Sequence, residues 1–178
     1  MRTTQAFLAA AVWLTVTATA LGPAGAAHAD PEIAPCDIQQ LSVAAAPQQA
    51  GVGHRAVQLN FTVQPDVSAC QLSGYPAVVA LVPAGTQIQA KPTPQGYLGG
   101  GTPGTTATLV PGHGAHAMVE WVATGTPQDP DCRTYGSAPI SVPLQVIPPG
   151  TWQTFDIPVS IGPNEGLCNL QVHLLTAD

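Results

Sequence analysis

Two histidines have a spacing that could hold a metal ion: His113 and His116 lie three positions apart at the start of a predicted strand. Met118 and Glu120 follow His116 at intervals of two, so these three side chains share one face of that strand. Imidazole with thioether suits copper, and imidazole with carboxylate suits zinc. The alternative is a plain solvent face, because these residues alternate with apolar neighbours. A copper or zinc site at His113 and His116 is therefore one hypothesis.

Motifs for other chemistries are weak. Gly99–Gly104 satisfies G-x-G-x-x-G, but a strand follows it where a dinucleotide site needs a helix. We therefore predict a flexible loop over residues 96–106 and no cofactor. No serine lies in a G-x-S-x-G context, so a hydrolase would need distant residues such as His173 and Asp156 to meet in space. By itself, His173 is predicted to be exposed, and His54 to lie in a turn.

Four aromatic residues could form a platform on which sugars or peptides stack: Trp121, Trp152, Tyr97 and Tyr135. The favoured interpretation places both tryptophans in the core. Trp121 is in phase with apolar neighbours, and Trp152 opens a predicted strand. The two tyrosines are predicted in loops.

Short strands must position these residues, because proline and glycine recur too often for helices of more than a turn or two. Residues 57–63 show the clearest alternation of apolar and polar side chains. Seven further strands are predicted over residues 41–43, 77–82, 106–110, 117–121, 142–146, 152–158 and 170–174. About eight strands with regular turns indicate an all-β, two-sheet antiparallel immunoglobulin-like sandwich. Pro143 and Pro158 are expected at edges or bulges, because central strands need every N–H.

All four cysteines lie beyond the N-terminal segment, at Cys36, Cys70, Cys132 and Cys168. An even number behind an export signal indicates two disulfides, with three possible pairings. We favour Cys36 with Cys70, which flank the first two strands, and Cys132 with Cys168. No C-x-x-C is present, so neither a cysteine zinc site nor thiol redox chemistry is expected.

The first 29 residues have the pattern of a secretory signal peptide. Arg2 precedes an apolar run over residues 6–21, and Ala27-His28-Ala29 offers a small-residue cleavage site. Cleavage after Ala29 would leave residues 30–178 as a single domain, secreted or otherwise outside the cytoplasm, with no stable membrane span. A retained transmembrane anchor is the alternative.

Basic residues are scarce. The chain has four Lys and Arg against ten Asp and Glu, for a formal net charge of −6. So few basic side chains cannot form the patch that neutralises nucleic-acid phosphates, nor the polybasic surface that anionic lipids attract. We therefore expect neither nucleic acid nor a membrane surface as partner.

Four stretches resemble one family in their order along the chain. They are Gly53-His54-Arg55, the C-x-L-x-G-Y-P stretch over Cys70–Pro76, the turn Leu109–Gly112, and Leu144–Gly150. Together they are similar to the actinobacterial secreted family known as domain of unknown function 4232, from Cys36 onward. The resemblance implies an immunoglobulin-like sandwich and an exported protein, and it brings no activity or ligand. Lipid-anchored members keep a cysteine just behind the signal, which this sequence lacks.

The leading functional hypothesis is an exported, non-enzymatic module that binds an envelope component or another exported protein through its loops. The alternative is an extracytoplasmic copper- or zinc-binding protein that uses His113 and His116.

Overall fold

Short strands joined by turns make up the chain, as the density of proline and glycine predicts. The computed structural model describes residues 32–125 and 132–178. Those residues hold fourteen strands and two 3-10 turns, η1 (Ile38–Gln40) and η2 (Pro83–Gly85). Ile33–Asp178 form one compact unit. No described helix is long and apolar enough to cross a membrane, and the predicted signal peptide at residues 1–29 lies outside the described residues.

The larger sheet has five main strands, of which β9 is the central one. Their order across the sheet is β1 (Leu41–Ala45), β3 (His54–Val63), β9 (Ala115–Val122), β13 (Gly166–His173) and β10 (Cys132–Thr134). Three short strands extend it: β2 (Gln49–Gly51) pairs with β3, β7 (Lys91–Thr93) with β13, and β14 (Thr176–Ala177) with β9. Every pairing in this sheet is antiparallel except that of β7 with β13.

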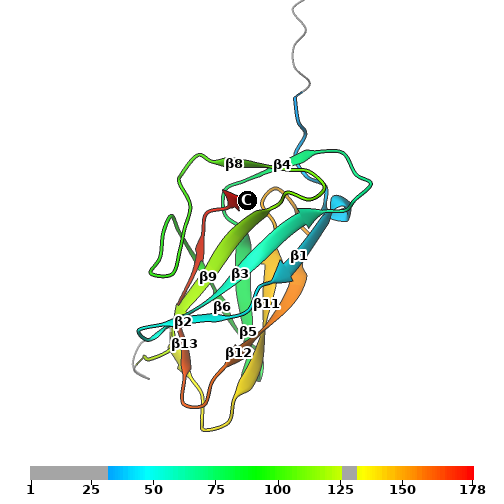
Figure 1. Ribbon diagram of the computed structural model, residues 1–178. Coiled ribbons are helices and arrows are strands. Elements are labelled where there is room, and N and C mark those ends of the chain that lie inside the picture. The colour runs from blue at the N-terminus through cyan, green and yellow to red at the C-terminus, as the bar shows by residue number, and fades with distance from the viewer. Residues whose placement is uncertain (1–31, 126–131) are drawn as a thin grey trace, which may run out of the picture. The chain divides into compact units, whose positions relative to one another are not determined.

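The smaller sheet packs against the larger one. Its order is β12 (Phe155–Ile161), β11 (Ile140–Ile147), β5 (Ala77–Val82) and β6 (Thr86–Gln89), all antiparallel. A two-stranded ribbon of β4 (Cys70–Ser73) and β8 (Thr106–Leu109) lies across one end, as Figure 1 shows. The predicted two-sheet antiparallel sandwich is confirmed.

The core lies between the two sheets and follows the predicted alternation. In β3 the side chains of Val57, Leu59, Phe61 and Val63 are at most 7% exposed. The same face of the sheet includes Trp121, which is fully buried. One hydrophobic cluster takes in the inward residues of both sheets, so these strands fold because each buries every second side chain.

The two prolines lie where the sheet does not need their missing N–H groups. Pro158 is in β12, at the edge of the smaller sheet, as predicted. Pro143 faces it from β11, an inner strand. The pairing of β11 with β5 covers only Leu144–Ile147, so Pro143 lies just beyond the point where the β5 ladder ends.

Both predicted disulfide pairings are confirmed: Cys36 bonds to Cys70, and Cys132 to Cys168. Cys132 and Cys168 face each other in the β10–β13 ladder. The two bonds span 34 and 36 positions of sequence. On the chain-entropy argument, each stabilises the fold by about 3–4 kcal/mol.

Two expectations about the fold were wrong in detail. The described strands outnumber the predicted eight because several consist of only two to four residues, too few to show an alternation. Trp152 is not a core residue: it precedes β12 and is 83% exposed. A side chain next to a strand need not follow that strand's alternation, because the turn before it sets its direction.

Candidate functional site

The glycine-rich segment between β7 and β8 folds over the outer face of the larger sheet. We call residues 94–105 the glycine loop. Beneath it, Met118 and Glu120 of β9 are only 6% and 3% exposed, so the alternative prediction of a plain solvent face is wrong at these two positions. Alternation along β9 identifies its core face, but it cannot reveal a loop that covers the opposite face.

Hydrogen bonds within the glycine loop give it a defined course. Gly96 N donates to Gly99 O at 2.7 Å, and Gly101 N donates to Pro94 O at 3.1 Å. The segment is a loop, as predicted, but where the sequence predicted a flexible one, two backbone bonds draw it into a narrow, hairpin-like turn.

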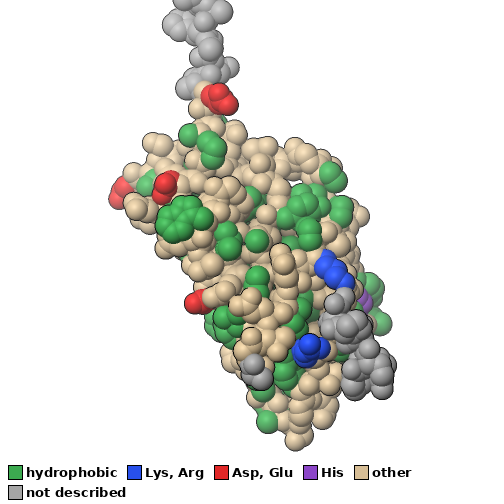
Figure 2. Space-filling model, turned by 180° about the vertical axis from the view of Figure 1, so that it is seen from behind, with side chains coloured by type: hydrophobic (Ala, Val, Ile, Leu, Met, Phe, Trp, Pro, Cys, Tyr) green, Lys and Arg blue, Asp and Glu red, His purple; other side chains and the backbone are tan. Residues whose placement is uncertain are grey.

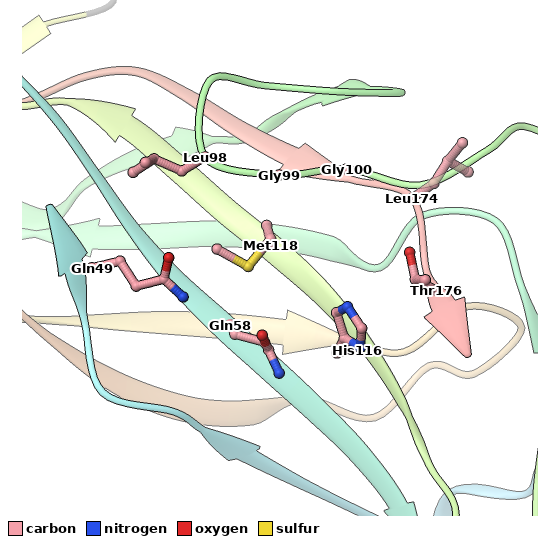
Figure 3. A pocket seen from close by; sticks show the side chains of 9 residues that line it. All are labelled: Gln49, Gln58, Leu98, Gly99, Gly100, His116, Met118, Leu174 and Thr176. Carbon is pink, nitrogen blue, oxygen red and sulfur yellow. The ribbon is translucent and has the colours of Figure 1, made fainter. Parts of the chain in front are cut away.

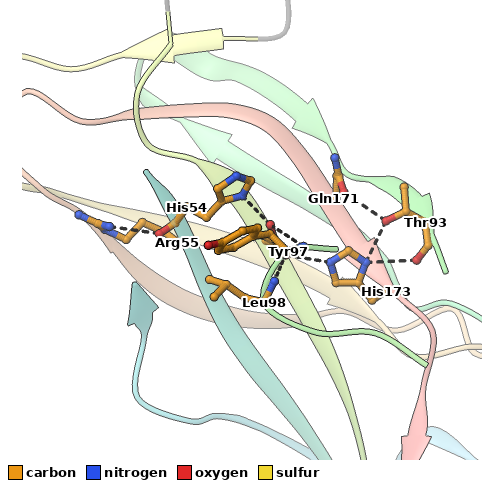
Figure 4. Close-up of polar contacts among 8 residues, drawn as sticks. His54, Arg55, Thr93, Tyr97, Leu98, Gln171 and His173 are labelled. Atoms are coloured by element: carbon orange, nitrogen blue, oxygen red, sulfur yellow. Dashed lines mark hydrogen bonds and ion pairs between the residues drawn. The ribbon is translucent and has the colours of Figure 1, made fainter. Parts of the chain in front are cut away.

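The Glu120 carboxylate holds this loop to the sheet. Its Oε1 accepts from His54 Nδ1 at 2.6 Å and from Tyr97 N at 3.2 Å. Its Oε2 accepts from Leu98 N at 2.9 Å, and His173 Nε2 lies 3.4 Å away. Figure 4 shows these donors converging from β3, β13 and the loop. One buried side chain therefore connects three separate parts of the chain to β9.

His173 is fully buried, although the sequence predicted it to be exposed. Because a carboxylate only accepts hydrogen bonds, His173 Nε2 carries a proton toward Glu120. On its other side, Nδ1 lies 2.8 Å from Thr93 Oγ1 and 3.2 Å from Thr93 O. The hydroxyl can donate to Nδ1 or accept from it, and the carbonyl can only accept from it, so Thr93 is the partner of Nδ1.

The sequence predicted His54 in a turn, and this was wrong: His54 is the first residue of β3. Its ring stacks on that of Tyr97, with centroids 4.7 Å apart and planes inclined by 21°. The neighbouring Arg55 forms an ion pair with Glu165, and its Nη1 donates to His54 O at 3.1 Å. The side chain of Tyr97, 59% exposed, thus rests on a ring that is itself fixed to Glu120.

The electrostatics of Glu120 follow from these contacts. Burial by itself raises the pKa of this carboxyl, but the hydrogen bonds from Leu98, His54, Tyr97 and His173 together outweigh burial and hold its pKa below the ordinary 4.5. The carboxylate is therefore ionised at neutral pH, which is the form that four donors require.

Gly96 must be glycine because the loop passes directly over the buried polar groups. A Cβ at this position would lie 2.3 Å from His173 Nε2 and 2.4 Å from Glu120 Oε2. Gly99 meets a similar limit, since its Cβ would lie 2.8 Å from Met118 Cγ. Gly96 and Gly99 thus allow the loop to approach the sheet closely.

A pocket of about 190 Å³ opens beside this network, and we call it the sheet pocket. Figure 3 shows β2, β3, β9, the glycine loop and the C-terminal segment around it. Its polar and apolar lining residues are Gln49, Gln58, His116, Thr176, Leu98, Gly99, Gly100, Met118 and Leu174. No lysine, arginine, aspartate or glutamate is among them, so the pocket offers hydrogen bonds without a formal charge of those types.

The two predicted metal ligands lie in different surroundings. His116 lines the sheet pocket, and its Nδ1 lies 2.7 Å from Asp178 Oδ1. His113 is an exposed residue of the turn that follows β8. Among the described residues, no group of three His, Cys, Asp or Glu side chains is arranged to hold a metal ion. A site at His113 and His116 stays a prediction.

A hydroxyl, an imidazole and a carboxylate also occur in series: Thr93, His173 and Glu120. This order resembles a nucleophile, base and acid. However, the single hydroxyl hydrogen of Thr93 is donated to Gln171 Oε1 at 3.3 Å, and Thr93 does not line the sheet pocket. His173 and Asp156, the pair considered from the sequence, do not meet, because Asp156 lies on β12 of the other sheet.

Sequence reasoning missed the buried network because its members come from β3, β7, β9, β13 and the loop. No local motif joins them. The one available signal was the concentration of glycines over residues 96–104, which indicates close backbone approach as well as a turn.

Comparison with known families agrees with the sequence resemblance. The family described as domain of unknown function (DUF4232) matches residues 36–176, which include all four cysteines, the glycine loop, Glu120 and His173. No curated protein and no solved structure matches the chain.

Replacing Gly96 with alanine should displace the glycine loop. The new methyl group would overlap His173 and Glu120, so we expect the free energy of unfolding to fall by about 1–3 kcal/mol and the amides of Tyr97 and Leu98 to exchange faster with solvent. Gly136→Ala is the matched control, because its Cβ would meet nothing within 4 Å. Denaturant melts and hydrogen exchange measure both effects, and equal behaviour of the two variants would contradict the close approach.

Glu120→Gln should destabilise the protein most at neutral pH, by about 1–3 kcal/mol, because an amide cannot accept from all four donors. The folded-state pKa of Glu120 is lowered, so its ionised form stabilises the fold above the unfolded value of 4.5. That contribution is lost as pH falls below 4.5 through the folded pKa. Urea melts should therefore show the difference from wild type shrinking in acid. A difference that stays constant with pH would contradict this role, and Asp156→Asn, on the exposed side of β12, is the control.

Proposed function

The chain belongs to the family of the domain of unknown function DUF4232, whose name assigns neither ligand nor reaction. We propose that it is an exported, non-enzymatic binding module. Its ligand occupies the sheet pocket. The observation that carries this proposal is the pocket's combination of uncharged polar groups and an apolar floor, framed by a loop that is fixed in place.

The lining favours a neutral ligand with amide or hydroxyl groups. Gln49, Gln58 and Thr176 can each donate and accept hydrogen bonds, and Met118 supplies an apolar floor. The volume of about 190 Å³ is below the roughly 300–1,000 Å³ of sites for drug-sized molecules. It suits one unit of a longer chain, such as one acetylated amino sugar, whose acetamido group carries both an amide and a methyl.

The walls of the pocket are held in place before a ligand arrives. Gln58 Nε2 donates to Asn60 Oδ1 at 2.7 Å, and the His116 ring contacts Asp178. On the opposite wall, Leu98 N donates to the buried Glu120. A preorganised site lowers the ordering cost of binding, which supports recognition as the role of this face.

The absence of an enzymatic role is supported by the placement of the acid–base groups. Glu120 and His173 are closed off beneath Gly96, and Glu120 is already engaged with loop and sheet donors. Turnover of peptidoglycan, glycan or ester substrates that disappears in Thr93→Val would overturn this part of the proposal, because that variant removes only the hydroxyl next to His173.

Export is supported by the N-terminal signal pattern and by the two disulfides, which persist in oxidising compartments. We expect protein recovered from outside the cell to begin at Asp30. Its intact mass should rise by four hydrogens on reduction, two for each disulfide. A chain that still begins at Met1 would contradict processing, and an unchanged mass on reduction would contradict the disulfides.

Binding in the sheet pocket can be tested with the disaccharide of N-acetylglucosamine. We expect amide resonances of Gly99, Gly100 and Met118 to shift on titration, and the affinity to fall about five-fold or more in Gln58→Ala, which removes the side-chain amide. Gln87→Ala, an exposed glutamine of β6, is the matched control. No shift in the pocket, or equal loss in both variants, would count against an acetylated sugar as ligand.

The metal-binding alternative is tested with the same protein. Calorimetric binding of copper or zinc tighter than about 10 μM, abolished in a His113→Ala, His116→Ala double variant, would favour it. Weaker binding, or binding that survives in the double variant, would remove it.

A further inference from the structure

Trp152 is a large apolar side chain that lies exposed on the surface. It is 83% exposed, whereas Trp121 in the core is fully buried. A tryptophan side chain can bury roughly 150–250 Å², more than almost any other residue. A second binding site, separate from the sheet pocket, would account for the exposure of this indole.

Hydrogen bonds hold the turn that precedes Trp152. Thr151 donates twice to Pro148 O, from its backbone N at 3.2 Å and from its Oγ1 at 2.9 Å. Gly150 takes the left-handed conformation, with φ of 76°, that this turn requires. The backbone before the indole is thus fixed, so little ordering cost remains for a partner that contacts it.

A small cleft of about 70 Å³ lies between this turn and the segment Cys36–Ile38, and Trp152 lines it. The opposite wall is also fixed: Cys36 is disulfide-bonded, and its N donates to Gln71 O at 3.0 Å. Asp37 in that wall caps η1, with Oδ1 accepting from Gln39 N at 2.9 Å. The cleft therefore places a carboxylate and an indole on one rigid frame.

The charge of this region is acidic. None of the basic side chains in the described residues pairs with Asp37. Asp66 lies in the turn after β3. Gln64, at the start of this turn, donates from its Nε2 to Gln39 O and from its N to Gln40 O, which joins the turn to η1. Figure 2 shows the acidic side chains of one face at its top and left and the basic side chains at its right. A partner with positive charge is the electrostatic complement of these acidic side chains.

We propose that Trp152 and Asp37 form a docking site for a lysine- or arginine-bearing segment of a partner protein. The cationic group lies over the indole face, where the ring quadrupole attracts it, and Asp37 supplies the opposite charge. Aromatic anchors of this kind carry much of the energy of protein interfaces.

The test uses the full chain and a short acetylated peptide that alternates lysine or arginine with glycine. A peptide with glutamine in place of each basic residue is the control probe. We expect the basic peptide to shift the Trp152 indole N–H resonance and to bind about five-fold less tightly to Trp152→Ala. Asp37→Asn keeps the cap of η1, because asparagine caps as well as aspartate, and should weaken binding about two- to three-fold.

Val52→Ala is the matched control for removing an exposed apolar side chain, because Val52 is 85% exposed and lies in the β2–β3 turn. It should leave binding unchanged, and added salt should weaken binding in the wild type. Equal binding of the glutamine peptide would overturn the proposal, as would full affinity in Trp152→Ala. Preference for neutral sugars over the basic peptide, with no effect of Asp37→Asn, would assign the surface to a saccharide and overturn it too.

Discussion

A carboxylate buried under a loop is stable only if hydrogen-bond donors replace the water that it has lost. Glu120 finds those donors on β3, on β13 and in the glycine loop. This one group therefore fixes the loop, the His54–Tyr97 stack and one wall of the sheet pocket together. Without it, the loop would lose the hydrogen bonds that Tyr97 N and Leu98 N donate to the sheet.

The fold was predictable because period-two alternation is a direct consequence of a two-layer core. β3 and β11 show it over their whole central part, and the pairing of cysteines follows from their places next to strands. The site was not predictable in the same way. On β9 both faces are buried, one by the core and one by the glycine loop, and only the first leaves a periodic signal. His173 and Glu120 looked like solvent residues because they are out of phase with the core.

Trp152 shows the opposite error. As a tryptophan at the start of a predicted strand, it was expected in the core. It lies two residues after a Pro-Pro-Gly turn and three before β12, and its side chain is exposed to water. Two rigid surfaces result on one sandwich. One is lined without lysine, arginine, aspartate or glutamate and is floored by β9, and the other is acidic and presents an indole. A small, disulfide-bonded core that fixes such surfaces supports the proposed recognition role, and it is compatible with the export pattern at the N-terminus.

The central claim, that an ionised Glu120 fastens the loop to the sheet, can be measured directly by an NMR titration. The side-chain carboxyl carbon of Glu120 and the amide protons of Tyr97 and Leu98 are followed together as pH is lowered. We predict a midpoint for Glu120 below 4.5, with both amides shifting at the same midpoint. A midpoint at or above 4.5, or amides that do not follow the carboxyl, would contradict the account.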